Sequence, residues 1–183
     1  MIRSGGFVGA LSFFVLTSVF AQSAPEWQTD VEAMLHEFMT CQSPIDDVSP
    51  CNRFVGRALK RIYNIGDFTK PNGEFMTANE IASAVVVSGN WTKLGSASDQ
   101  NTLNQAQGYA NVKKAIIAVS SGSPHGHVAI ILPGSQTQSG SWGLKVPNSA
   151  SFFRNKPDKS YIGKPLSFAW ATPNGVSIYG RNF

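Results

Sequence analysis

The stretch "SPHGHVAIILPG", residues 123–134, leads two histidines into a continuous apolar run. Because side chains alternate between the two faces of a strand, His127 shares a face with Ala129 and Ile131. The residues between them are also apolar, which predicts a central strand covered on both faces. His127 is then either a core histidine with a single hydrogen bond or a catalytic base. His125 precedes the strand and is expected to belong to a loop.

The overall composition excludes several classes of partner. The chain has 183 residues and a formal net charge of +4. It has no stripe of Lys and Arg with interleaved aromatic residues, so we expect no nucleic acid partner. The small positive excess suits an anionic bacterial wall. The three histidines are not clustered with acidic residues, so we expect no metal site and no cofactor.

The N-terminus has the pattern of a secretory signal. Arg3 precedes an apolar run over residues 7–20, and a small-x-small pattern ends at Ala21, which predicts cleavage near Ala21. The apolar run is shorter than the roughly 20 residues that span a bilayer, so we expect no membrane span. Residues 1–21 are therefore expected to be a signal peptide. Residues 22–183 would form a single, monomeric domain that is secreted to the periplasm or outside the cell.

The two cysteines, Cys41 and Cys51, allow two interpretations. In an exported protein, an even number of cysteines predicts a disulfide. The alternative is a nucleophile at Cys51, because Ser49 and Pro50 in "SPCNRFVGRALKRIY" (49–63) are typical of a helix start. A thiol in the first turn lies at the positive end of the helix dipole, which lowers its pKa. Papain-like folds bring such a cysteine against a histidine that begins a strand.

Four short motifs follow one another in a recognisable order. They are "CNRFV" at 51–55, "WTKL" at 91–94, "AQG" at 106–108 and "GHVA" at 126–129. In these motifs the chain resembles the type VI secretion amidase effector family 1, a branch of the NlpC/P60-type cysteine peptidases. The resemblance covers roughly residues 50–134.

The resemblance implies a fold and an activity. The fold is a papain-like NlpC/P60 α+β domain, in which N-terminal helices, one with the cysteine, pack on an antiparallel sheet with the histidine. Cys51 would be the nucleophile and His127 the general base of a peptidoglycan amidase. The bond cleaved would join γ-D-glutamate to meso-diaminopimelate in the stem peptide, with an antibacterial or wall-lytic effect. The resemblance also implies an immunity-type protein inhibitor as a partner.

Further site residues are expected from their positions. NlpC/P60-type sites place a polar group on the strand after the histidine, to orient the imidazole. In "SGSWGLKV" this predicts Ser141, with a backbone carbonyl as the alternative. Ser49 and Asn52 flank Cys51 and are candidate substrate-binding residues. Trp91 is either a core anchor or a substrate contact.

Two features depart from the family. Effectors exported through the type VI apparatus need no cleaved signal, so the signal here suggests a protein secreted on its own account. The insertion "YANVKK" at 109–114 lengthens a loop on the substrate side. Two other functions therefore stay open: a wall-binding module without activity and with a Cys41–Cys51 disulfide, or a Cys–His amidase or transferase that acts on another amide.

The rest of the chain predicts helices first and strands later, an α+β order. Expected helices lie near 31–38, from Pro50, from a "TANE" capping box at 77–80 through Val87, and up to Gly108. Expected strands lie at 114–120, 127–133 and 141–146, followed by a hairpin of 166–171 with 176–180. The polar tip at 133–141 is either a simple turn or a rim of the substrate groove.

Overall fold

The computed structural model describes residues 1, 26–39, 53–123, 125–153 and 156–182. Apart from Met1, the signal peptide predicted at residues 1–21 lies outside the described residues. Cys41, Ser49, Cys51 and Asn52 lie outside them as well. Where the described residues form helices, none is long and apolar enough to cross a membrane.

A six-stranded antiparallel sheet forms the centre of the molecule, in the order β1-β8-β2-β3-β6-β7. The strand β3, which carries His127, pairs with β2 on one side and β6 on the other. The prediction of a central strand is thus confirmed. The strands are β1 (Trp91–Ser96), β2 (Ile116–Ser120), β3 (His127–Ile131), β6 (Asn148–Ser151), β7 (Tyr161–Pro165) and β8 (Ser177–Arg181).

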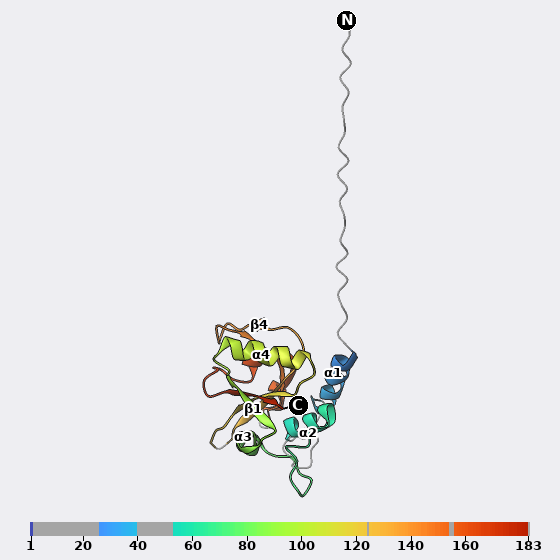
Figure 1. Ribbon diagram of the computed structural model, residues 1–183, viewed down its shortest axis with the longest axis vertical. Helices are drawn as coiled ribbons and strands as arrows, with labels where there is room; N and C mark the ends of the chain where they lie inside the picture. Colours follow the sequence, from blue (N-terminus) through green and yellow to red (C-terminus); the bar gives the residue numbers. More distant parts are fainter. Residues whose placement is uncertain (2–25, 40–52, 124, 154–155, 183) are drawn as a thin grey trace.

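Helices cover both faces of the sheet (Figure 1). The sheet therefore separates the core into two clusters, one on each face. On one face, α1 (Glu26–Met39), α2 (Phe54–Tyr63) and α3 (Ala78–Val87) share a core cluster with Val128 and Ile130 of β3 and with Leu132 directly after it. On the other face, α4 (Gln100–Asn111) packs against Ala129 and Ile131. The α+β class is confirmed, because apolar side chains on both faces of β3 require a layer of structure on each side.

The helix starts agree with the sequence in one case and differ in another. The capping box of α3 is formed, since Thr77 accepts from the Glu80 amide and Glu80 accepts from the Thr77 amide. The prediction that α2 starts at Pro50, with Ser49 as its cap, is wrong. The helix begins at Phe54, because Arg53 before it has a left-handed backbone with φ of 57°, which a regular helix does not allow.

Three predicted elements have different boundaries. α4 continues past Gly108 to Asn111 and takes in part of the insertion expected to be a loop. Residues 166–171 are not a strand, because Leu166 and Ala169 are both buried at a spacing of three, which suits the 3₁₀ turn η2 (Leu166–Phe168). Residues 141–146 contribute only β5 (Lys145–Val146), which pairs with β4 (Thr137–Gln138) in a separate small hairpin.

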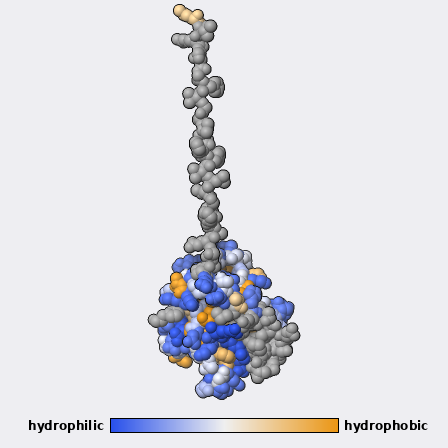
Figure 2. Space-filling model, turned by 90° about the vertical axis from the view of Figure 1, so that its right-hand side faces the viewer, coloured by the Kyte–Doolittle hydropathy of each residue, from blue (hydrophilic) through white to orange (hydrophobic). Residues whose placement is uncertain are grey.

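The side of the molecule drawn in Figure 2 is largely hydrophilic, with small and scattered hydrophobic patches. Among the described residues, the exposed large hydrophobic side chains besides the N-terminal Met1 are Val86, Val87, Val112 and Phe168. Scattered apolar residues of this kind are normal on a protein surface. Phe168 differs from the others because it borders a hollow.

Candidate functional site

His127 is held at the start of β3 by a serine of the neighbouring strand. Its Nε2 lies 2.6 Å from Oγ of Ser151. Ser151 pairs in register with Ala129, which places its side chain on the same face of the sheet as His127. Among the described residues, Ser151 provides the one hydrogen bond to the imidazole. The other ring nitrogen, Nδ1, is left for another partner.

Aromatic side chains fix the plane of the imidazole. Phe153 stacks on it, with ring centroids 4.5 Å apart and an angle of 19° between the planes. Trp170 meets it edge-on, at 5.1 Å and 75°. The indole of Trp170 is itself fixed, because its Nε1 donates to Oγ of Ser120, at 2.8 Å. Ser120 pairs with His127 across β2 and β3, so the strand beside His127 also holds the indole that contacts its ring.

Burial determines the charge of His127. It lowers the pKa of the imidazole to about 4, because the charged form loses its hydration and Ser151 is a neutral partner. At neutral pH the ring is therefore uncharged and has one nitrogen that accepts a proton. A neutral imidazole, rather than an imidazolium, is the form that this environment favours.

The loop before β3 explains why a glycine precedes His127. Nδ2 of Asn79, in the first turn of α3, donates to the carbonyl oxygen of Gly122 at 3.0 Å, and its Oδ1 accepts from the Gly122 amide at 3.4 Å. A Cβ atom on Gly126 would collide with the side-chain oxygen of Asn79 and with the carbonyl oxygen of Ser120. Glycine at 126 thus allows the loop to pack closely where it enters β3.

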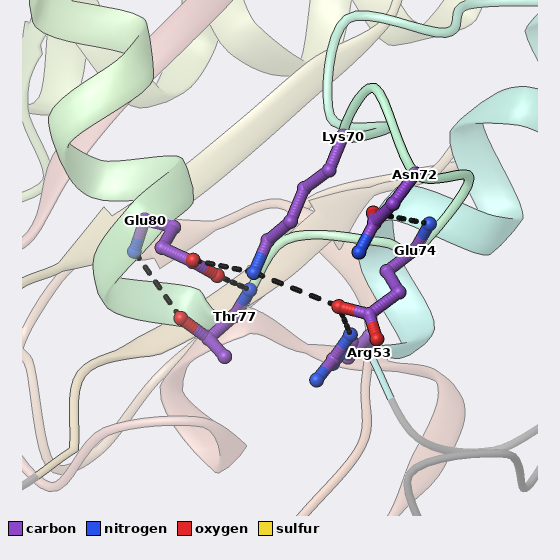
Figure 3. A network of polar contacts seen from close by, with 6 residues as sticks. All are labelled: Arg53, Lys70, Asn72, Glu74, Thr77 and Glu80. Atoms are coloured by element: carbon purple, nitrogen blue, oxygen red, sulfur yellow. Dashed lines mark hydrogen bonds and ion pairs between the residues drawn. The ribbon is translucent and has the colours of Figure 1, made fainter.

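A network of charges joins the start of α2 to the start of α3 (Figure 3). Nη1 of Arg53 lies 3.3 Å from Glu74, while Nζ of Lys70 lies 4.0 Å from Glu74 and 2.6 Å from Glu80. The hydrogen bond from Lys70, followed by that from the Thr77 amide, lowers the pKa of Glu80 to about 2. The network holds Arg53, the left-handed residue before α2, against Glu74 in the segment that leads into α3.

The start of α2 also lies near the segment that holds His127. Phe54, its first residue, contacts Phe152 with ring centroids 6.3 Å apart. Phe152 stands between Ser151 and Phe153, which both touch the imidazole. In the segment 151–153, Phe152 therefore faces α2, while Ser151 and Phe153 face His127.

Two of the predicted site residues lie elsewhere. Ser141 is in the β4–β5 hairpin, where its Oγ lies 3.2 Å from Oγ of Ser139, so it does not orient His127. Trp91 is 5% exposed and stacks on Phe68 at 5.1 Å, and its Nε1 donates to Asp67 at 3.0 Å. Its burial and these contacts agree with the core-anchor alternative.

Ser151 is the site residue that the sequence prediction missed. The sequence predicts a polar group on the next strand along the chain after β3, but the polar residue lies on β6. The β4–β5 hairpin comes between β3 and β6 along the chain, whereas β3 and β6 are neighbours in the sheet. The signal that could have found it is the alternation in "NSAS", residues 148–151, which places Ser149 and Ser151 on one face of the strand.

Within the described residues, no three or more His, Cys, Asp or Glu side chains gather where they could hold a metal ion. Comparison with models of known protein families and with curated protein sequences found no match. The resemblance in the four motifs therefore stays a prediction, and the chemistry must be argued from the site itself.

Proposed function

We propose that the protein is a secreted amidase that hydrolyses an amide bond in the stem peptide of bacterial peptidoglycan. Cys51 would be the nucleophile, His127 the general base and Ser151 the residue that positions the base. The observation that supports this most is the geometry of His127. Its ring is fixed in plane by Phe153 and Trp170 and hydrogen-bonded through Nε2, which leaves Nδ1 to accept a proton.

The proposed reaction uses both ring nitrogens. With Nε2–H donated to Ser151, Nδ1 accepts the proton of the Cys51 thiol, and the thiolate attacks the amide carbonyl. The imidazolium then protonates the leaving amine as the C–N bond breaks and a thioester remains. Water, deprotonated by Nδ1, attacks the thioester and releases the carboxylate and the thiol. The bond between γ-D-glutamate and meso-diaminopimelate is the one that the resemblance implies.

Covalent geometry limits where the nucleophile must act. Cys51 stands three residues before Phe54, and three residues of extended chain span at most about 11 Å. Phe54 contacts Phe152, whose neighbours hold His127. Because α2 and His127 belong to opposite faces of the sheet, the proposal requires the thiol to reach His127 around the end of β6.

Digestion of purified stem peptides tests this function. The secreted protein should split the peptide into two fragments, identified by mass spectrometry. Cys51→Ala should lose at least about 10³-fold in rate, because the nucleophile has no substitute. Cys41→Ala is the matched control and should retain the activity. Equal rates for the Cys51→Ala variant and the parent would contradict the proposal.

A further inference from the structure

A hollow lies between the β4–β5 hairpin and the turn η2, on the same face of the sheet as His127. Its volume is about 340 Å³, at the small end of ligand sites in proteins. Its lining includes three serines, an amide side chain, an open glycine and an exposed aromatic ring: Ser139, Ser141, Ser167, Gln138, Gly140 and Phe168.

The lining determines the chemistry of a ligand. None of its residues is charged, which disfavours an ionic ligand. The hydroxyl groups and the amide donate and accept hydrogen bonds, while the ring of Phe168, 59% exposed, offers an apolar surface. A ligand with neutral hydroxyl groups around its edge and an apolar face matches both properties, and a sugar chain is such a ligand.

The hollow is built on fixed parts of the fold. Ser139 is 5% exposed, and its Oγ accepts from the Trp142 amide at 3.3 Å. The indole of Trp142 donates to the Trp170 carbonyl oxygen at 3.0 Å, and Trp170 meets the ring of His127. The wall of the hollow therefore connects through two tryptophans to the imidazole.

We propose that this hollow binds the neutral glycan strand of the bacterial wall, an inference that rests on the proposed function. The strand carries the stem peptides, so binding it on the face of His127 would bring the scissile amide to the site. Ser141, expected to orient the histidine, would contact the glycan instead.

A tetramer of N-acetylglucosamine, a neutral sugar chain with the acetamido groups of the wall strand, provides the test, titrated by calorimetry into the full chain with the Cys51→Ala substitution. We expect saturable binding. Phe168→Ala removes the apolar face, and Gly140→Gln fills the hollow; each should weaken binding about tenfold. Gly140 accepts a side chain without strain, because its φ is not positive and a Cβ would meet nothing within 4 Å. Gly89 has the same two properties, so Gly89→Gln is the matched control and should bind as the parent does.

Three results would overturn the inference: no binding by the folded parent, unchanged binding by both variants, or equal binding of a neutral glucose tetramer, which lacks the acetamido groups of the wall strand. Circular dichroism confirms that each variant is folded. The probe contains no peptide, so its binding does not depend on amidase activity. Conversely, a failure to bind glycan would leave the cleavage of free stem peptides unaffected, which separates this inference from the proposed function.

Discussion

Two partly buried polar clusters lie on the same sheet, and they are satisfied to different degrees. Asp67 accepts from Nε1 of Trp91 at 3.0 Å and from Nε and Nη2 of Arg181 at 2.9 and 3.3 Å. Within the described part of the chain, His127 has a single hydrogen bond, to the neutral hydroxyl of Ser151. The first cluster pairs its charge fully, as a structural cluster must. The second leaves one ring nitrogen available, as a catalytic base requires.

The largest expected effect is on activity at His127. His127→Gln keeps a polar side chain of similar size but removes the base, so the rate of stem-peptide cleavage should fall about 10³-fold or more. His125→Gln, in the exposed loop two residues earlier, is the control and should stay within about twofold of the parent. Equal losses in the two variants would show that the distinction between the histidines is wrong.

The second effect is on stability at Asp67. Asp67→Ala leaves the guanidinium of Arg181 and the indole of Trp91 without their acceptor, which should lower the free energy of unfolding by about 2–4 kcal/mol. Urea denaturation measures this loss. The cleavage rate per folded molecule should not change. Asp158→Ala, at an exposed position, should alter stability by less than about 0.5 kcal/mol. A selective loss of activity in Asp67→Ala would give that cluster a catalytic role and remove the contrast.

The third effect is a pH dependence of stability that belongs to His127. Its folded pKa of about 4 lies below the ordinary value of about 6.5, so the unfolded chain binds more protons between these values. The free energy of unfolding should therefore fall by about 2–3 kcal/mol as the pH drops from 6.5 to 4. His127→Gln should remove this slope. The loss from Glu80, with its folded pKa of about 2, should begin only below about pH 4.5. A slope that persists between pH 6.5 and 4.5 in His127→Gln would refute the assignment.

The smallest effect distinguishes two fully buried serines of one strand. Ser151→Ala should lower kcat about tenfold and shift the acid limb of its pH profile, because the imidazole loses its hydrogen bond. Ser149 contacts the Tyr161 hydroxyl and the Lys164 carbonyl oxygen, each at 3.0 Å. Ser149→Ala should lower stability by about 1 kcal/mol and leave the pH profile unchanged. An unchanged profile in Ser151→Ala would mean that Ser151 has only a structural role.

The sequence predicts those elements that local patterns determine. The continuous apolar run after His127 corresponds to the observed β3, and the capping box at Thr77 corresponds to the start of α3. The sequence-based prediction fails where contacts between residues far apart in the chain determine the structure. Along the chain the β4–β5 hairpin comes between β3 and β6, but the two strands pair in the sheet. The partner of His127 is therefore Ser151 and not Ser141.

The same limit applies at the start of α2. Ser49 and Pro50 form a strong local start signal, yet the helix begins at Phe54, after the left-handed Arg53. Arg53 is tied to Glu74, 21 residues later in the chain, and no local pattern contains that contact. The burial that keeps His127 neutral likewise depends on Phe153 and Trp170, which come from later segments.

The alkylation rate of Cys51 tests the central claim most directly. Iodoacetamide is added to the secreted protein, and each cysteine is followed separately by peptide mass spectrometry. If Nδ1 of His127 takes the proton of the Cys51 thiol, Cys51 should be free and should react about tenfold faster than in His127→Gln. The rate at Cys41 should be the same in both proteins. A Cys41–Cys51 disulfide in the secreted protein, or an equal rate at Cys51 with and without His127, would contradict the account.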